Sequence, residues 1–459
     1  MTADLWPQPV LDLLDAGGDR PVFEDGDRVT TAAEMASLIR RIAAGLRLRG
    51  VGPGAGVLLD LGVDAPAFAA TMAAFAVGAT VSGPRSALPG FLRIDDAAVE
   101  GLAAAPSRPL AAAGRPGDAA RIIWTSGSTG EPKGAVQTYA ALSAAWAPHP
   151  DRWPPAIASL ARHLGRYLVF GSLSSQVMLE YGVLALAAGG TLVVAPRPVF
   201  PAALVEHRAT ASVITVGKLQ QLVRAQRESP VDLGHLEALM VSGSPLSPAR
   251  LAEALEVLGP VLFHGYGQTE TGMIAMATPE EMLASPAALA SVGRPPPVVD
   301  VVVRDGELFV RTPGQASAYW DDPVETAAVF VDGWVRTRDL GMIDDDGRVR
   351  LLGRARDVVI VNAVLVHAGP VERVLAQDGS VAEAYVVGAP DDVTGEAVHA
   401  YVVPAPGRLV DAAALRALVA ARLGELAVPQ TVTVIDSVPV APSGKPDKAV
   451  LRAARGRVR

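Results

Sequence analysis

One loop combines the residue types that bind phosphate. It follows a predicted strand at 121–124 and reads Thr125-Ser126-Gly127-Ser128-Thr129-Gly130-Glu131-Pro132-Lys133-Gly134. Glycine lets backbone N–H groups approach a phosphate, hydroxyls donate further hydrogen bonds, and lysine supplies a point charge. Because glycine follows Lys133, the loop lacks the G-K-[ST] core of a Walker A motif. A plain glycine-rich linker is the alternative, and the hydroxyls and the lysine argue against it.

This loop resembles, almost letter for letter, the signature of the adenylate-forming superfamily of acyl-CoA synthetases, peptide-synthetase adenylation domains and luciferases. The resemblance implies that the phosphates of ATP are bound by Thr125, Ser126, Ser128, Thr129, Gly130 and Lys133. A second block is similar to the superfamily's Y-G-x-T-E element and reads His264-Gly265-Tyr266-Gly267-Gln268-Thr269-Glu270. Two matches in the expected order identify the chain as a member of this superfamily.

The second block carries groups for three tasks. A tyrosine ring can stack on adenine, a threonine hydroxyl can hold the α-phosphate, and a carboxylate can bind Mg²⁺, which prefers oxygen ligands. By resemblance these roles fall to Tyr266, Thr269 and Glu270, with Gly265 also at the nucleotide, and we count Thr269 and Glu270 as catalytic. The resemblance thus implies ATP and Mg²⁺ as cofactors.

Two further blocks bear on the ribose. Residues 333–340, Gly-Trp-Val-Arg-Thr-Arg-Asp-Leu, look like the superfamily's G-W-x-x-T-G-D-L and imply that Asp339 accepts hydrogen bonds from the ribose hydroxyls. Arg338 stands where the superfamily has glycine, which adds a large cation beside the nucleotide. Residues 353–357 look like the interdomain hinge, which implies that Arg354 also meets the ribose and that Arg356 pivots the smaller domain.

A lysine near the C-terminus completes the resemblance. Residues 442–448, Pro-Ser-Gly-Lys-Pro-Asp-Lys, resemble the P-x-G-K motif, whose lysine is carried on a flexible turn into the active site, and this implies a catalytic Lys445. Negative charge grows as a carboxylate attacks the α-phosphorus, so an aimed ammonium stabilises the transition state more than the ground state. An exposed, solvated lysine is the alternative for Lys445, and we expect that state for Lys448.

Several residues are candidates for binding the acyl substrate, and most of them also have another interpretation. Ser174 stands where many acyl-CoA synthetases have histidine, and His264 could contact adenine or the substrate carboxylate or be a structural histidine. Lys218 could pair with an acidic substrate group, although a surface lysine is the favoured interpretation. A loop that resembles the superfamily's segment between adenine and acyl group reads Gly243-Ser244-Pro245.

At two positions the sequence departs from the pattern of the superfamily, and these departures restrict the expected substrate and acyl acceptor. Gln176 occupies the position where amino-acid activators carry an aspartate, which disfavours a standard α-amino acid substrate. Ala363 replaces a glycine that in CoA ligases lies against the pantetheine arm, and even one methyl group can obstruct a close backbone approach. An acid–CoA ligase is the leading hypothesis, with transfer to a carrier protein, an amine or another small nucleophile as the alternative and a silent nucleotide-binding protein as a third.

The elements that must position these residues alternate between helix and strand. A helix is expected from Thr31 to Gly50, followed by strands at 57–61, 121–124, 191–194, 212–216 and 239–241, with helices at 67–77, 184–188 and 218–227 between them. Such alternation is typical of parallel sheets, in which the loops at the strand ends recur on one edge. Residues 85–120 are expected to be a surface connection.

The length of 459 residues exceeds one ordinary core, so two domains are expected. We predict an α/β protein with a large N-terminal domain of stacked α/β sheets, residues 1–352, and a small mobile C-terminal α/β domain, residues 353–459. The active site is expected to lie between them. Short strands are predicted at 299–310, 349–352, 384–387 and 398–403, with a helix at 411–426.

Composition excludes several classes of function. The sequence has no cysteine, so disulfides, thiolate zinc sites, iron–sulfur clusters and a cysteine nucleophile are excluded. A net charge of −8 provides no basic surface for nucleic acid. The N-terminus lacks the pattern of a signal peptide, and the apolar runs are broken by glycine or proline, so we expect no membrane span and a cytoplasmic location. The expected partners are a small carboxylic acid and CoA, or an acyl-carrier protein.

Overall fold

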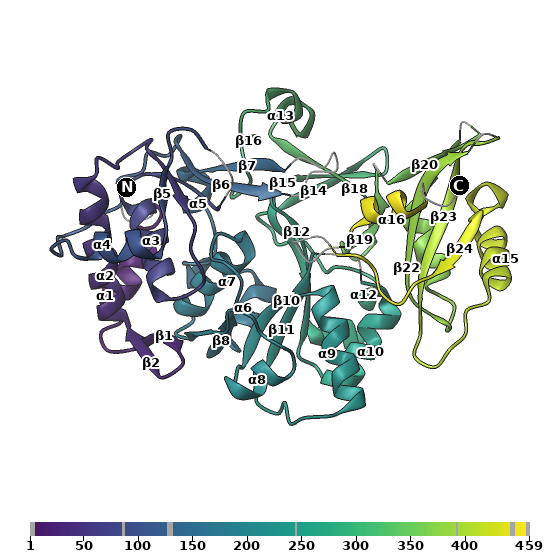
Figure 1. Ribbon diagram of the computed structural model, residues 1–459, viewed down its shortest axis with the longest axis horizontal. Coiled ribbons are helices and arrows are strands. Elements are labelled where there is room, and N and C mark those ends of the chain that lie inside the picture. Colours follow the sequence, from purple (N-terminus) through teal and green to yellow (C-terminus); the bar gives the residue numbers. More distant parts are fainter. Residues whose placement is uncertain are drawn as a thin grey trace.

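The computed structural model describes residues 5–84, 88–125, 132–243, 246–355, 357–362, 364–391, 393–440 and 446–455. The molecule is elongated, with the N-terminal elements at one end and a smaller C-terminal group of elements at the other (Figure 1). It is an α/β protein built from four sheets, which confirms the predicted fold class.

An eight-stranded sheet forms the centre of the large domain. In spatial order its strands are β13 (Gly272–Ala277), β12 (Leu262–Gln268), β11 (Ala238–Ser242), β10 (Ala211–Thr215), β8 (Arg166–Val169), β9 (Thr191–Val194), β1 (Pro21–Asp25) and β2 (Arg28–Thr31). Strands β8 to β12 run parallel, and their residues are nearly all buried, as expected for a parallel sheet covered on both faces. The loops that follow these strands therefore meet at one edge.

A six-stranded sheet lies beside it. Its order is β16 (Ala318–Tyr319), β7 (Lys133–Thr138), β6 (Ala119–Thr125), β4 (Thr80–Ser82), β3 (Gly56–Leu59) and β5 (Leu92–Ile94). The prediction of a surface connection at 85–120 was wrong, because this stretch contains β5 and helix α4 (Asp96–Ala103). Strand β5 pairs in parallel with β3, and α4 packs its buried Val99 and Leu102 into the core, contacts that no local pattern reveals.

Two five-stranded sheets complete the fold. One contains β14 (Asp300–Arg304), β15 (Glu307–Arg311), β18 (Trp334–Ile343) and β17 (Phe330–Val331), with β19 (Val349–Arg354) paired to β18. The other, in the C-terminal part, contains β21 (Val364–His367), β20 (Val358–Val361), β23 (Gly395–Pro404) and β22 (Val381–Asp391), with β24 (Thr431–Val434) paired to β23. The strands predicted at 299–310, 349–352, 384–387 and 398–403 are confirmed.

Helices cover the faces of the sheets. Those of the N-terminal half are α1 (Gln8–Ala16), α2 (Ala32–Leu48), α3 (Ala65–Ala76), α4, α5 (Tyr139–Ser143), α6 (Pro155–Ala161), α7 (Gln176–Ala187), α8 (Ala202–Glu206) and α9 (Val216–Glu228). The others are α10 (Pro248–Leu258), α11 (Pro279–Ala284), α12 (Pro286–Leu289), α13 (Pro323–Val329), α14 (Ala368–Leu375), α15 (Ala412–Leu423) and α16 (Lys448–Arg455). Short 3₁₀ turns lie at Pro150–Arg152 and Glu425–Ala427. The helix expected from Thr31 is confirmed as α2, which begins with a capping box between Thr31 and Glu34.

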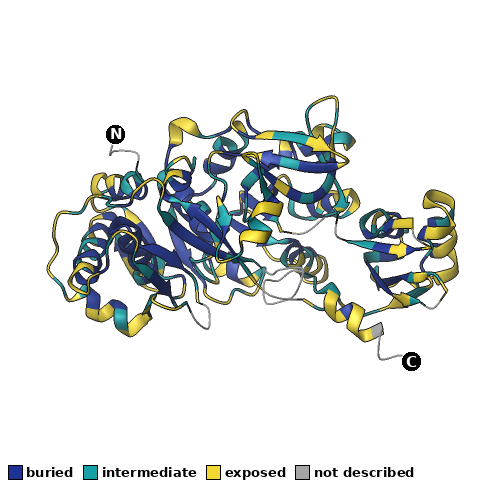
Figure 2. Ribbon diagram, turned by 90° about the horizontal axis from the view of Figure 1, so that it is seen from above, coloured by how far each residue is buried: buried dark blue, intermediate teal, exposed yellow. Residues whose placement is uncertain are grey.

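Burial follows this layering. The strands and the inward faces of the helices are buried, and exposed residues lie on the outer faces (Figure 2). The C-terminal sheet has a hydrophobic core of its own, around Val371 and Val402. It contacts the rest of the molecule where Arg250 Nε donates to the carbonyl of Ala382, 3.1 Å away. Within the described residues, no helix is long and apolar enough to cross a membrane.

Candidate active site

The ends of the glycine-rich loop are fixed by an antiparallel pair of strands. Thr125 ends β6 and Lys133 begins β7, and the two residues are paired across the strands. The hydroxyl of Thr125 donates to the carbonyl oxygen of Lys133 at 3.3 Å. The remaining predicted phosphate contacts of this loop lie outside the described residues: Ser126, Ser128, Thr129 and Gly130.

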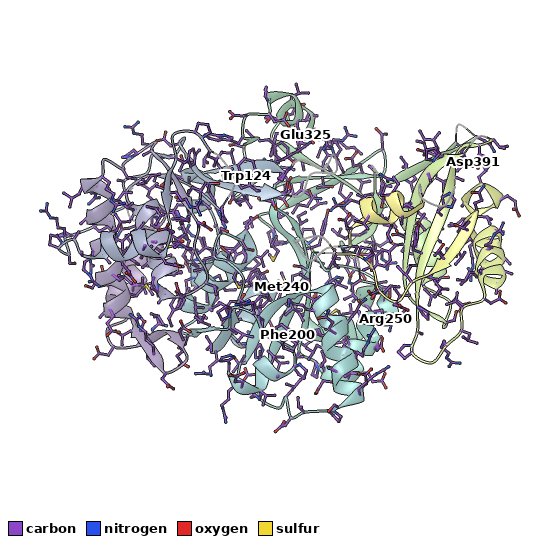
Figure 3. The ribbon with its side chains drawn as sticks, viewed as in Figure 1. Trp124, Phe200, Met240, Arg250, Glu325 and Asp391 are labelled. Carbon is purple, nitrogen blue, oxygen red and sulfur yellow. The ribbon has the colours of Figure 1, made fainter. Side chains whose placement is uncertain are left out.

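The side chain of Lys133 is held by an acidic residue of α13. Its Nζ lies 2.8 Å from Glu325, and it also lies over the ring of Tyr319, 5.9 Å from the centroid. Glu325 accepts a second charged hydrogen bond from Arg338, which is the main reason that the pKa of this carboxyl is lowered to about 2. Glu325, labelled in Figure 3, therefore stays ionised and aims the lysine.

Arg338, the large cation that the sequence predicts beside the nucleotide, is paired with an acidic residue. Its guanidinium contacts Glu325, which it shares with Lys133, and the side chains of Arg338 and Glu325 are largely buried. The residue has φ of +57°, the left-handed conformation in which glycine is normally favoured. It lies in an irregular stretch of the β15–β18 pairing, and such bulges turn the next side chain toward the interior. That next residue is Asp339.

Asp339 is the centre of the best defined cluster in the site. It is only 5% exposed and accepts hydrogen bonds at Oδ2 from the Tyr266 hydroxyl, at 2.7 Å, and from Gln268 Nε2, at 2.6 Å. Arg354, its partner across β18 and β19, places Nε 3.0 Å from Oδ1. Burial and the neighbouring Asp339 raise the pKa of Tyr266. Residues of three separate sequence blocks, Tyr266, Asp339 and Arg354, thus meet at one carboxylate.

This convergence agrees with comparisons with known proteins. Residues 86–320 match the family of AMP-binding enzymes, and residues 370–445 match the AMP-binding enzyme C-terminal domain. The chain belongs to the AMP-binding enzyme family. The match extends over more than half of the chain and contains the glycine-rich loop and the Tyr266 block, the two segments on which the resemblance was first based.

Individual members of the AMP-binding family cover different shares of the chain. It is 32% identical to a medium/long-chain-fatty-acid–CoA ligase of Mycobacterium tuberculosis, over 75% of this chain but only 63% of the ligase. It is 29% identical to a feruloyl-CoA synthase of an Amycolatopsis species, over 94% and 95% of the two chains. The solved structure of the amide bond synthetase McbA from Marinactinospora thermotolerans is similar with a TM-score of 0.81 and 30% identity, over 97% of this chain and 99% of that one.

Glu270 is the residue that the sequence predicts as a metal ligand, and its side chain is held by a tyrosine. Glu270 follows β12 and is oriented by the hydroxyl of Tyr319, which donates to Oε1 at 2.6 Å. No cluster of three or more metal-binding side chains occurs among the described residues. One carboxylate suits Mg²⁺, which commonly takes few protein ligands and completes its shell with phosphate oxygens and water. Thr269, between Gln268 and Glu270, is half-buried.

Two of the predicted substrate residues lie in the interior of the large domain. Ser174 shares a hydrogen bond of 2.9 Å with Ser172, and its side chain lies against Gly83 at the end of β4. His264 in β12 is 5% exposed, and burial lowers its pKa to about 4, so the ring is neutral at physiological pH. Its Nδ1 is enclosed and has no hydrogen-bond partner among the described residues. Their substrate contacts remain predictions.

Lys218 differs from the surface lysine that the sequence favoured. It lies near the start of α9, and its Nζ is 5.3 Å from the ring centroids of both Phe170 and Phe200. Partial burial lowers its pKa. Phe170 follows β8 and α9 follows β10, so this ammonium lies at the same sheet edge as the nucleotide residues. Gly243 follows β11 at this edge with φ of +94°.

Several predicted residues fall in segments that the structure does not describe. These are Lys445, Ser244, Pro245, Arg356 and Ala363. Lys448 does lie in the described part, and the expectation that it is solvated was wrong. Its ammonium binds Asp357 and lies 2.7 Å from Glu372, and only 24% of the side chain is exposed. This lysine joins the segment after the hinge to the C-terminal helix.

Sequence reasoning missed the residues that hold the motif side chains. Glu325 and Tyr319 carry no signal of their own, because each acts on a partner that is distant in sequence, and Gln268 was named in the second block without a role. The one available signal was the charged Arg338 at a glycine position, which predicts a compensating carboxylate nearby.

The glycines of the Tyr266 block give a testable contrast. A Cβ at Gly267 would lie 2.4 Å from the backbone oxygen of Gly272, whereas a Cβ at Gly265 would meet only the flexible end of Met240, at 2.8 Å (Met240 is labelled in Figure 3). We expect Gly267→Ala to shift the turn that carries Thr269 and to lower kcat/KM for ATP at least ~10-fold, since misplacement of about 1 Å can cost more. Gly265→Ala should cost less, because methionine adapts, and Gly117→Ala is the control that should stay within about 2-fold, because a Cβ there would meet no atom within 4 Å. Equal losses in Gly267→Ala and Gly265→Ala would contradict this explanation.

Proposed function

We propose that this protein uses ATP to activate a carboxylic acid as its acyl-adenylate and then transfers the acyl group to CoA. The observation that carries the proposal is the meeting of Tyr266, Asp339 and Arg354, in which a buried carboxylate that could accept from ribose hydroxyls lies beside an aromatic ring that could stack on adenine. Membership of the AMP-binding family supports it, as do relatives named as CoA ligases.

In the first step an oxygen of the acid attacks the α-phosphorus of ATP. A bond to phosphorus forms, the bond to the bridging oxygen of the β-phosphate breaks, and pyrophosphate leaves. Lys133, held by Glu325, would bind the outer phosphates, Thr269 would bind the α-phosphate, and Lys445 would stabilise the charge that develops during transfer. Glu270 would hold Mg²⁺, which would supply positive charge to the phosphates.

In the second step the thiol of CoA attacks the acyl carbonyl, loses its proton to solvent and displaces AMP. This step would require the C-terminal domain, which we place at 353–459 after an N-terminal domain of 1–352, to move about the segment near Gly353. A Cβ at Gly369 would lie 2.9 Å from the Cα of Gly353, so the start of α14 packs closely on this segment. A cytoplasmic location is part of the proposal, since CoA and ATP are cytoplasmic metabolites and the sequence has no cysteine.

In a second candidate function, the protein also forms the acyl-adenylate but transfers the acyl group to an acceptor other than CoA. The amide bond synthetase with TM-score 0.81 matches nearly the whole chain, and Ala363 stands where CoA ligases need glycine. Both observations favour an amine, a carrier-protein thiol or another small nucleophile in place of CoA.

One assay tests the proposal. Pyrophosphate release is measured across short, medium, aryl and dicarboxylic acids, with and without CoA. Acid-dependent turnover that requires CoA supports the ligase, and acid-dependent pyrophosphate exchange that is indifferent to CoA supports the second candidate. No pyrophosphate release with any acid would contradict both and favour a silent nucleotide-binding protein.

A further inference from the structure

Helix α7 is buried except at its last residue and on one face of its first two turns. Most of its residues are apolar and enclosed, but Gln176, Val177 and Glu180 remain partly exposed in its first half, as does Ala187 at its end. Gln176 and Val177 lie four and three residues before Glu180, so both neighbour it on the helix surface. A carboxylate is an unusual residue on an otherwise apolar helix in the interior of the large domain.

This face lies next to the catalytic segment. The amide Nε2 of Gln176 is 3.7 Å from the position of a Cβ at Gly272, two residues after Glu270. Glu180 lies one turn further along the helix, about 6 Å from Gln176 at 1.5 Å per residue. An acid whose carboxyl group reacts near Glu270 would therefore extend its tail along the face that carries Glu180.

Arg121 approaches the same region from β6. It is 5% exposed, and its Nη2 donates to the carbonyl oxygen of Ser174, just before α7, at 2.8 Å. The sheet position of Arg121, four residues before Thr125, faces the interior, where an unpaired guanidinium is costly. Glu180 and Arg121 act on each other electrostatically, and no ion pair joins them among the described residues.

Both charged groups keep polar atoms available. Among the described residues, none donates a hydrogen bond to the carboxylate of Glu180, and Arg121 makes only the bond to Ser174. The unpaired polar atoms of both side chains remain accessible to solvent. Burial raises the pKa of Glu180 to about 7 and lowers that of Arg121 to about 10. Glu180 on α7 and Arg121 beside the start of α7 thus both keep polar atoms without a partner among the described residues.

We propose that Glu180 and Arg121 bind a hydroxyl group on the tail of the substrate, so that the substrate class is a hydroxylated carboxylic acid; this inference rests on the proposed acid activation. A hydroxyl group can donate to Glu180 and accept from Arg121 at once. An ammonium group can only donate, and it would place a second cation near the buried guanidinium of Arg121. An unsubstituted tail would leave both groups without a partner.

The test measures acid-dependent pyrophosphate release by the full chain with matched acids. The acids are 3-phenylpropanoate with its 4-hydroxy and 4-aminomethyl derivatives, and hexanoate with 6-hydroxyhexanoate and 6-aminohexanoate. We expect kcat/KM to favour one hydroxylated acid over its unsubstituted parent by at least ~30-fold, because a site built to bind a hydroxyl rejects the analogue that lacks it. Glu180→Leu should reduce that preference to near unity, and Glu180→Gln, which keeps an acceptor oxygen, should keep part of it. Glu228→Gln, on the exposed end of α9, is the control.

The outcomes separate this inference from the proposed function. Turnover of several acids without preference for the hydroxyl, a preference for the ammonium acids, or a preference that survives Glu180→Leu would overturn the inference and leave acid activation standing. Failure of every acid to release pyrophosphate would overturn both. If Glu180→Leu does not fold, Glu180→Gln and the wild-type preference decide the question.

A pH profile gives a second readout. The groups that act on Glu180 are Arg121 from β6 and Tyr181 beside it on α7, and the pKa of Tyr181 is raised by burial, so the phenol stays neutral. Ionisation of Glu180 makes it a stronger acceptor, so KM for the hydroxylated acid should fall as pH rises through about 7. In Glu180→Gln this dependence should be absent, whereas a merely structural role for Glu180 would leave KM independent of pH in both proteins.

Discussion

Replacing Asp339 with alanine should lower kcat/KM for ATP by about 100- to 10,000-fold. Two hydrogen bonds from ribose hydroxyls to a buried carboxylate would be lost, and charge-assisted bonds contribute roughly 1.5–3 kcal/mol each, with about 1.4 kcal/mol for every factor of ten. The variant also leaves the guanidinium of Arg354 and the hydroxyl of Tyr266 without their acceptor. Steady-state pyrophosphate release at varied ATP measures the effect.

Controls separate nucleotide binding from folding. Asp300→Ala removes an exposed carboxylate paired with Arg311 in the same sheet, and it should leave kcat/KM within about 2-fold, since exposed ion pairs contribute little. Tyr266→Phe removes one donor to Asp339 while the ring remains, so its loss should be well below that of Asp339→Ala. A normal KM for ATP in a folded Asp339→Ala protein would rule out the ribose role.

Motif residues were predictable because their spacing is local. Thr125 and Lys133 flank one loop, and Tyr266 and Glu270 are four residues apart at the end of β12, so the sequence contains both the groups and their local arrangement. The partners were not predictable in this way. Glu325 fixes Lys133 from a helix far along the chain, and pairing of this kind depends on tertiary packing.

The helices and strands also divide into those with a local sequence signal and those that depend on tertiary pairing. Helix α2 has a regular apolar spacing and a capping box, so its start at Ala32 could be predicted from the sequence. Strand β5 has three residues and gains its structure from pairing with β3, and α4 is short, so neither has a periodic signal of sufficient length. Gly and Pro around residues 85–120 favoured a loop interpretation that tertiary pairing overrode.

Two lysines three residues apart should respond in opposite ways to substitution. Lys445→Ala is expected to lower pyrophosphate release at least ~100-fold, since removal of one preorganised group that stabilises transition-state charge typically costs this much. Because the effect is confined to the transition state, kcat should fall more than KM rises, and thermal stability should not change. Lys445→Arg should restore little activity if a compact ammonium is required.

Lys448→Met is the matched variant, and it should act on stability. Burial alone would lower the pKa of Lys448, but the carboxylates of Glu372 and Asp357 outweigh burial and raise it, so the ammonium is charged in the folded protein at neutral pH. Its removal would leave two partly buried carboxylates unpaired, at a cost of about 3 kcal/mol. Thermal unfolding followed by circular dichroism should therefore show a lower Tm for Lys448→Met than for Lys445→Ala. The reverse pattern, with a stable but inactive Lys448→Met and a fully active Lys445→Ala, would move the catalytic role from Lys445 to Lys448.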